Sequence, residues 1–368
     1  MSLYHFQLFV SKWQALIGSL LFALHPIHST SVNFVMGRTD LLCALFYFCS
    51  MMFWVICLEK DKSKIFYLLS YAFFLLSLLS KEMAVTLPVM IMFVSLSFSG
   101  GSLKQRILLA AKEISPFIFI TIAYLAVRFF FWSNHHDSIA GYMNYSASNI
   151  IGNYVKWAFG LIYPFDLYKA RGLLENDPLI LIGTSALLLI LLLTAVKYLI
   201  WPFQKSLLRE KSFWLGIVWF VITLVPIMGG NAHRWYLYIP SVSLSFLIVA
   251  VFRIIHNKPK IIFVFLFAGF LIFSSAELYR QSLIWAQQSN ITENFLRQVK
   301  QQGIDKIDKL CFANVPFGYK SSFLFTFQSL EKALFLHYGK MPKIHILSYV
   351  NLTVNSDLIL SQNHRTGF

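Results

Sequence analysis

The sequence is poor in charged residues, and in acidic residues most of all. Only 13% of its 368 residues are charged, and Asp and Glu together number 16. A soluble domain carries roughly 25% charged residues, so this chain cannot cover a water-facing surface. Apolar residues make up 57% of the chain, which indicates that much of its outside faces lipid.

Cysteine is also scarce, and no metal site is predicted. The four cysteines have neither metal-ligand nor disulfide-framework spacing, so we interpret them as small apolar fillers. His25 and His28 are three residues apart, but Pro26 stands between them and no carboxylate is close. Metal binding, polar capping between two spans and substrate contact are the three interpretations of this pair. The run Asn134-His135-His136-Asp137 has a metal site as one interpretation and is better explained as a solvated loop. The sequence supports no cofactor, and a divalent metal stays an open alternative without supporting residues.

Basic residues outnumber acidic ones, and the net charge is +15. In a soluble protein such an excess would indicate nucleic-acid binding. Here the basic residues gather in short loops between apolar runs, a pattern typical of membrane topology determinants. We therefore expect no nucleic-acid partner, and we expect membrane lipids and a lipid-linked phosphate as the anionic partners.

Long apolar runs recur along most of the chain. A helix needs about 20 apolar residues to cross a bilayer. Runs near this length lie at 8–24, 41–58, 65–80, 84–98, 113–132, 179–200, 213–229, 236–255 and 260–276. They predict an all-α polytopic membrane domain over residues 1–279, with about nine spans. Lys and Arg concentrate after every second run, which places those loops in the cytoplasm. Because a crossing at 150–165 would reverse this pattern, we predict an in-plane or re-entrant helix there, on the outer face.

The sequence changes in character after Tyr279. Polar and charged residues occur throughout 280–368, and their pattern predicts a helix at 293–302, a strand at Lys309–Val315 and a turn at Pro316–Gly318. A segment of roughly 90 residues can form a small domain. We therefore predict a small C-terminal α/β domain outside the membrane, on the periplasmic or lumenal side.

Three short polar stretches at the predicted outer ends of spans hold the candidate site residues. These are His25, His28, Arg38 and Asp40 in the first, Lys81 and Glu82 in the second, and His233, Arg234 and Tyr236 in the third. Charged groups at membrane depth need partners, so pairing of Arg38 with Asp40, and of Lys81 with either Glu82 or Asp40, would explain them structurally. Alternatively, the basic groups bind a lipid-linked phosphate, for which Arg has the better geometry.

The same stretches resemble the motifs of one enzyme family. They read LLFALHPIHSTSVNFVMGRTDLLCALFYF (20–48), LLSLLSKEMAVTLPVMI (75–91) and AHRWYLYIPSVSLSFLIVA (232–250). In this order and spacing they resemble the signatures of the transmembrane and tetratricopeptide-repeat O-mannosyltransferases and their bacterial relatives. That family belongs to the C-type (GT-C) glycosyltransferase superfamily, and the resemblance covers residues 10–285.

The resemblance implies a GT-C-like helical bundle and a hexosyltransferase reaction on the outer face. A mannose-like sugar would pass from a polyprenyl-phosphate carrier to a hydroxyl of a protein or glycan acceptor. The substrate-binding residues would be Arg38, Lys81, His233, Arg234, Tyr236, His25 and His28, and the nearest carboxylates are Asp40 and Glu82. We expect a multi-pass integral membrane protein, of a bacterial inner membrane in preference to the endoplasmic reticulum.

The chain departs from the family pattern in three respects. Family members have a further span and a large outer loop upstream of the HPxH run, with an acidic residue taken as the catalytic base. We expect this chain to start too late to contain them. Thr30 stands where the family has Glu, and the tetratricopeptide repeats are missing. The base is therefore not identified, and the alternative function is a polyprenyl-lipid-binding scaffold or a transporter-like protein without catalysis.

Overall fold

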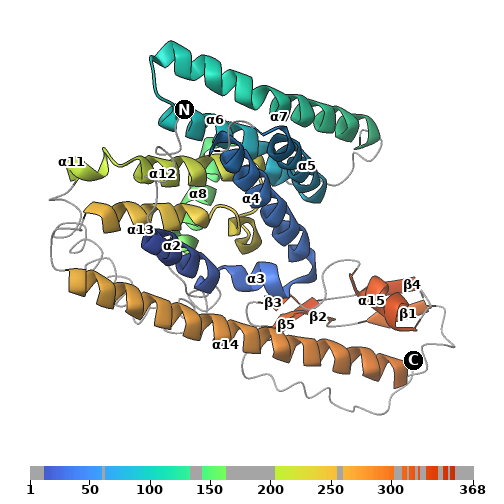
Figure 1. Cartoon of the computed structure of the whole chain (residues 1–368). Helices are drawn as coiled ribbons and strands as arrows, with labels where there is room; N and C mark the ends of the chain where they lie inside the picture. Colours follow the sequence, from blue (N-terminus) through green and yellow to red (C-terminus); the bar gives the residue numbers. More distant parts are fainter. Residues whose placement is uncertain are drawn as a thin grey trace. The chain divides into compact units, whose positions relative to one another are not determined.

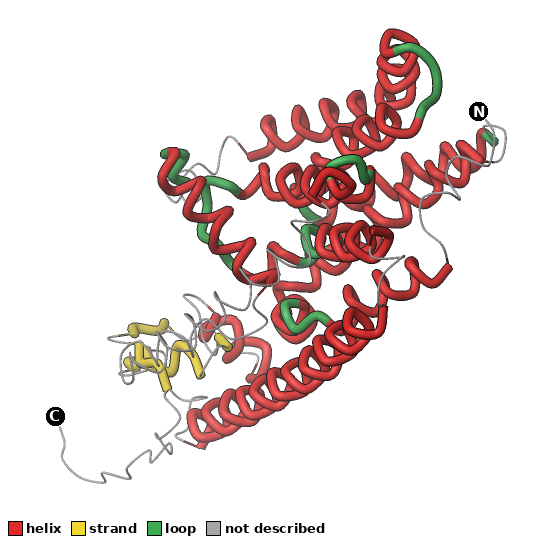
Figure 2. The backbone as a smooth tube through the Cα atoms, turned by 90° about the vertical axis from the view of Figure 1, so that its left-hand side faces the viewer, coloured by secondary structure: helices red, strands yellow, loops and turns green. Residues whose placement is uncertain are grey.

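The structure, a computed structural model, divides into two compact units. One comprises Met1–Pro164 with Ala186–Leu278, and the other Phe165–Ser185 with Tyr279–Phe368. The residues described are 12–59, 63–132, 143–162, 204–254, 260–301, 309–312, 315–319, 322–323, 329–338, 343–346 and 349–352. In the first unit the described residues form helices joined by loops, whereas the described strands all lie after α14 (Figure 2).

The predicted apolar runs coincide with helices wherever the structure describes them (Figure 1). The elements are α2 (Lys12–Leu24), α3 (His28–Asn33), η1 (Val35–Gly37), α4 (Arg38–Glu59), α5 (Lys64–Ser80), η2 (Glu82–Thr86), α6 (Leu87–Phe98), α7 (Leu103–Trp132), α8 (Ala147–Ile162), α11 (Gln204–Leu207), α12 (Lys211–Leu224), η6 (Val225–Ile227), η7 (Arg234–Leu237), α13 (Val242–Ile254) and α14 (Lys260–Gln301). The run predicted at 179–200 lies outside the described residues. The helix predicted at 150–165 appears as α8, and its placement against a bilayer stays a prediction.

Two described helices are long and apolar enough to cross a membrane, Val35–Leu58 and Leu103–Phe131. Other apolar helices are shorter, such as the 13 residues of Lys12–Leu24. A helix of that length rises about 20 Å, against a hydrocarbon core of about 30 Å. The prediction of a mainly helical chain with helices of membrane-spanning length is confirmed. The nine crossings and their orientation stay predictions.

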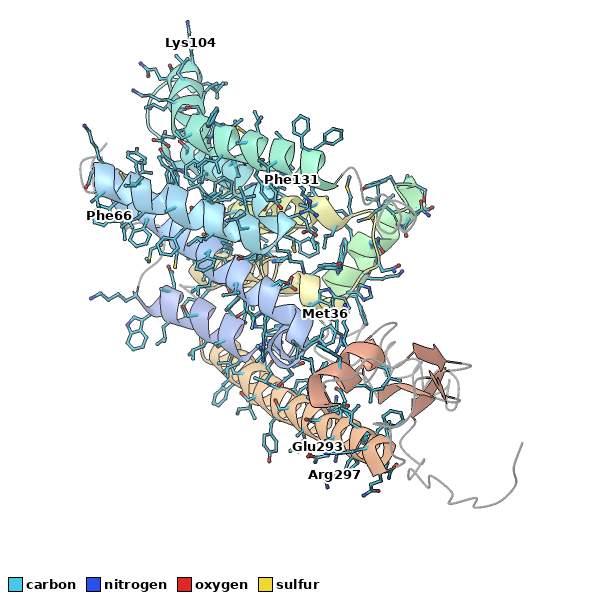
Figure 3. The ribbon with its side chains drawn as sticks, turned by 90° about the vertical axis from the view of Figure 1, so that its right-hand side faces the viewer. Met36, Phe66, Lys104, Phe131, Glu293 and Arg297 are labelled. Atoms are coloured by element: carbon cyan, nitrogen blue, oxygen red, sulfur yellow. The ribbon has the colours of Figure 1, made fainter. Side chains whose placement is uncertain are left out.

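A ladder of small polar residues joins α4 to α5. Ser50 Oγ donates to the Ser70 carbonyl oxygen at 2.7 Å, and Ser70 Oγ donates back to the Ser50 carbonyl at 2.8 Å. Seven residues away along each helix, Ser77 Oγ donates to the Cys43 carbonyl at 2.8 Å. Small side chains let membrane helices approach closely, so the ladder fixes the register of this antiparallel hairpin. Met36 and Phe66, labelled in Figure 3, lie near its two ends.

Large aromatic side chains fill the core that this hairpin shares with its neighbours. Tyr47 and Trp54 of α4, Phe74 of α5, Phe117 of α7 and Trp219 of α12 are all fully buried. In contrast, α7 presents a strongly apolar surface: Phe119, and the consecutive Phe129, Phe130 and Phe131 near its end, are 71–79% exposed. An exposed apolar surface of this kind suits contact with lipid.

The C-terminal segment of the second unit begins at Tyr279, within α14. This helix is continuous, so the span predicted at 260–276 and the helix predicted at 293–302 belong to one element, and the predicted boundary at residue 279 falls inside it. Later, β1 (Lys309–Phe312) pairs in parallel with β4 (Lys343–Ile346). A second sheet has the order β3-β2-β5, from Ser322–Phe323, Val315–Tyr319 and Tyr349–Leu352, and one helix, α15, spans Ser329–Tyr338.

The turn predicted at Pro316–Gly318 is wrong, because these residues lie inside β2. A register shift between Pro316 and Gly318 lets the strand continue past them, as a bulge can accommodate a proline that cannot donate to the ladder. These described segments form two small sheets and do not establish a single α/β domain. That domain, and its position outside the membrane, stay predictions.

Candidate functional site

Three segments far apart in sequence meet at the Lys81 side chain. Its Nζ lies 2.6 Å from Oδ1 of Asp40 and 4.7 Å from the centroid of the Tyr236 ring. The Asp40 side chain is only 4% exposed and that of Lys81 13%. One ammonium group therefore joins the three stretches that carry the family resemblance, through an ion pair and a cation–π contact.

The local backbone explains why Lys81 reaches Asp40. Helix α5 ends at Ser80, and Lys81 is extended, with φ −162° and ψ 146°, while its N–H donates to the Ser77 carbonyl. Asp40 lies in the first turn of α4, where a carboxylate is favoured by the helix dipole. The register of the hairpin sets these two residues opposite each other. The ion pair thus runs between two stretches, and of the two partners expected for Lys81 the structure shows Asp40.

Glu82 pairs with a residue that no motif contains. Its Oε2 lies 3.5 Å from Nη1 of Arg128, near the end of α7. The same Nη1 donates to the hydroxyl of Tyr124 at 2.8 Å, one helical turn earlier. Both charged side chains are part-exposed, 33% for Arg128 and 44% for Glu82, so this pair is far more open to solvent than Lys81–Asp40.

The third stretch presents stacked aromatic rings. The imidazole of His233 stacks on Trp235 at 4.1 Å between centroids and 12° between planes. Burial lowers the pKa of His233, with a further lowering from the Lys81 charge. At neutral pH the platform is therefore uncharged, which suits stacking against the apolar face of a ligand.

The Gly229-Gly230 turn before this platform is held by α8. The Asn153 side-chain amide donates to the carbonyl oxygens of Met228 at 3.0 Å and Gly230 at 2.7 Å. A Cβ added at Gly229 would lie 2.6 Å from the Tyr145 ring, so no larger residue fits without movement. The Gly229-Gly230 turn is therefore held in place by Asn153 and packed closely against the Tyr145 ring.

His25 and His28 are buried and engaged with protein atoms. The backbone N–H of Ile27 donates to Nδ1 of His25, which leaves Nε2–H to donate to the Leu161 carbonyl at 2.9 Å. His28 Nε2 lies 2.8 Å from Oγ of Ser241. Burial lowers the pKa of His25 to about 4 and of His28 to about 3. The two neutral rings thus tie the first stretch to α8 and to the start of α13, as polar connectors.

The two arginines of the motifs have different surroundings. Arg38 is exposed at the start of α4 and forms no ion pair with any residue that the structure describes. Arg234 is half-buried, and its charge contributes to the low pKa of His25, so it lies near that ring. Convergence of Arg38, Lys81 and Arg234 on one cavity stays a prediction. Within the described residues, no group of three His, Cys, Asp or Glu could hold a metal ion.

Sequence reasoning missed Arg128 and Tyr124. Both lie inside the apolar run predicted at 113–132, and neither belongs to a motif. One signal was available, because an arginine within a predicted span is expensive and indicates a partner or a function. The sequence could not name that partner, since Glu82 lies 46 positions away.

Comparison with known proteins finds partial similarity to protein O-mannosyl-transferases. The chain is 34% identical over 82 residues to protein O-mannosyl-transferase TMTC3 of Homo sapiens, a match that covers 22% of this chain and 9% of that protein. It is 56% identical over 36 residues to protein O-mannosyl-transferase TMTC4 of Homo sapiens and of Mus musculus, which covers 10% of this chain and 5% of each relative. No family model matches the chain, and no solved structure matches it.

These similarities are consistent with a GT-C-like relationship, over less than a tenth of each relative's length. The relatives come from human and mouse, so the expected preference for a bacterial inner membrane is not supported. The O-mannosyl-transferase activity that their names state remains a property of those proteins.

Proposed function

We propose that this chain belongs to a membrane glycosyltransferase that moves a mannose-like sugar from a polyprenyl-phosphate carrier to an acceptor hydroxyl on the outer face. The observation that carries the proposal is the meeting of three motif-like stretches at Lys81, through Asp40 and Tyr236. Partial similarity to protein O-mannosyl-transferases supports the same reaction class. The acceptor is a protein or a glycan.

In this proposal the charged side chains of the site have two roles: cations bind the phosphate of the carrier, and one carboxylate takes the proton of the acceptor hydroxyl. Sugar transfer needs a base that takes the proton of the attacking hydroxyl and positive groups that stabilise the departing lipid phosphate. Asp40 is a poor base, because it is buried and its Oδ1 faces the Lys81 ammonium at 2.6 Å. The Glu82 side chain is more exposed, and its ion pair with Arg128 is longer, at 3.5 Å. We therefore assign the role of base to Glu82. Arg234 and Arg38 supply charge for the phosphate.

The test is transfer of radiolabelled mannose from polyprenyl phosphate to a protein acceptor by the purified chain in lipid vesicles. Arg234→Lys should lower the rate about tenfold, since a lysine keeps the charge and loses the two-pronged phosphate contact. Lys104→Arg is the matched control, because Lys104 is exposed at the start of α7. Undiminished transfer by Arg234→Lys would contradict the assignment, and no transfer by the unmodified chain would contradict the proposal itself.

A second function, lipid binding without turnover, is favoured by one observation. Both candidate carboxylates are engaged by cations, Asp40 by Lys81 and Glu82 by Arg128. A scaffold that binds polyprenyl lipid would need the cations and no free base. The vesicle assay distinguishes the transferase from the scaffold, because a scaffold binds the carrier and transfers no labelled sugar to the acceptor.

A further inference from the structure

Successive residues at the α5–α6 connection form two ion pairs of unequal strength. Lys81 lies 2.6 Å from Asp40 and both side chains are largely buried, whereas Glu82 lies 3.5 Å from Arg128 with both part-exposed. Water screens exposed pairs, and a single long N–O contact contributes little. Of the two pairs, Glu82–Arg128 is the one that a competing anion can separate.

Arg128 does not depend on Glu82 for its orientation. The hydroxyl of Tyr124 accepts a hydrogen bond from Arg128 Nη1 at 2.8 Å, from the preceding turn of α7. A guanidinium carries five N–H donors in a planar fork, so an anion can replace the carboxylate without moving the arginine head group. Such pre-orientation lowers the ordering cost of binding.

The surroundings of Arg128 select an amphiphilic ligand. On the same helix, Val127, Phe129, Phe130 and Phe131 are 57–79% exposed, and α7 is one of the two helices of membrane-spanning length. Figure 3 shows Phe131 near one end of α7 and Lys104 near the other. A ligand that reaches Arg128 at this end of α7 meets exposed apolar and aromatic side chains around the helix, with the Arg128 guanidinium among them.

We propose that Arg128 binds the phosphate of a lipid, which displaces Glu82 and thereby frees the Glu82 carboxylate. The inference rests on the proposed function, because it makes arrival of the carrier phosphate the event that exposes the base. The recognition chemistry is a phosphate group on a long apolar chain. A polyprenyl phosphate and an anionic phospholipid such as phosphatidylglycerol both supply it.

The test measures binding of sugar-free polyprenyl phosphate to the full chain in phosphatidylcholine nanodiscs. Arg128→Gln should weaken binding at least about tenfold, the loss of one charge-assisted contact. Glu82→Gln should strengthen binding, because it removes the competing carboxylate. Lys104→Gln, at the opposite end of α7, is the control for charge and should leave binding unchanged.

Arg128→Gln should weaken lipid binding and Glu82→Gln should strengthen it. These opposite effects distinguish displacement of Glu82 by the phosphate from an ion pair that only stabilises the fold. Weaker binding in Glu82→Gln, or unchanged binding in Arg128→Gln, would overturn the inference. Arg128→Lys covers the case in which Arg128→Gln fails to fold, and it should still bind less tightly than the unmodified chain. Competition by phosphatidylglycerol as effective as that by polyprenyl phosphate would assign the site to bulk anionic lipid, and weaker competition would assign it to the carrier.

Failure of the proposed function would look different. Binding that follows the predicted signs without any sugar transfer would refute the transferase and leave the Arg128 site intact. Transfer that proceeds normally while Arg128→Gln binds polyprenyl phosphate unchanged would refute the Arg128 site alone.

Discussion

Replacing Lys81 by methionine tests the ion pair on which the site is built. Methionine keeps the length and apolar stem of lysine and removes the ammonium. The Asp40 carboxylate, 4% exposed and 2.6 Å from Lys81 Nζ, would then be a buried charge without its partner. The cation–π contact with Tyr236 is lost in the same variant.

The expected cost follows from the burial of this pair. Removing one partner of a buried ion pair destabilises a protein by about 3–5 kcal/mol, because the other charge stays buried and unpaired. A partly desolvated cation–π contact adds about 1 kcal/mol. Asp40→Asn combined with Lys81→Met leaves no unpaired charge, so the double variant should recover a large part of the loss.

Reversible unfolding in mixed micelles, followed by the fluorescence of the nine tryptophans, measures these differences. A double-mutant cycle over Asp40→Asn and Lys81→Met should give a coupling energy of at least about 1.5 kcal/mol. Strictly additive single losses, or a Lys81→Met cost below about 1 kcal/mol, the range of exposed pairs, would refute the reasoning. Lys104→Met is the control, and it should change stability little.

Three further predictions concern other parts of the chain. Because burial lowers the pKa of His28 from 6.5 to about 3, the unfolded chain takes up the proton first, so stability should fall as the pH drops from about 6.5, by up to about 1.4 kcal/mol per pH unit. His28→Phe should remove that part of the slope in unfolding curves recorded at several pH values. A Cβ at Gly37 would clash with the Ser31 carbonyl oxygen, so Gly37→Ala should lower the free energy of unfolding by about 1–3 kcal/mol. Gly152→Ala, where no atom lies within 4 Å, should be neutral or stabilising, and an equal loss in both variants would contradict the steric argument. Finally, in an otherwise cysteine-free chain, a cysteine at position 104 and Cys311 should react with a membrane-impermeant maleimide from opposite sides, and labelling of both from one side would exclude the predicted topology.

Local patterns in the sequence were enough to predict most described helices. Hydropathy depends only on composition in a window of about 20 residues, and α4 and α7 appear where such windows lie. The end of α5 before Lys81 and the start of α6 near Pro88 follow equally local rules, because proline favours the first turn of a helix. Cys43 and Ser50 lie seven residues apart on α4, but the sequence alone does not show that they meet Ser77 and Ser70 of α5.

Partners that lie far apart in sequence could not be predicted in the same way. The sequence indicated that Lys81 and Glu82 needed counter-ions, because unpaired charges near a membrane are costly. It offered Asp40 and Glu82 as alternative partners of Lys81 and did not indicate Arg128 as the partner of Glu82. The choice depends on the register of α4 against α5 and on the packing of α7. Continuous α14 was missed for a related reason, because a change in polarity at residue 279 does not interrupt backbone hydrogen bonding.

The sequence by itself therefore determined the apolar, helical character of the chain and the residue types of its candidate site. Both depend on interactions within a few turns of helix. Tertiary structure alone decided which charges meet, that His25 and His28 are neutral connectors, and that Tyr236 lies against Lys81. Such contacts can join residues more than 200 positions apart, as for His28 and Ser241. Only tertiary packing brings such residues within hydrogen-bonding distance.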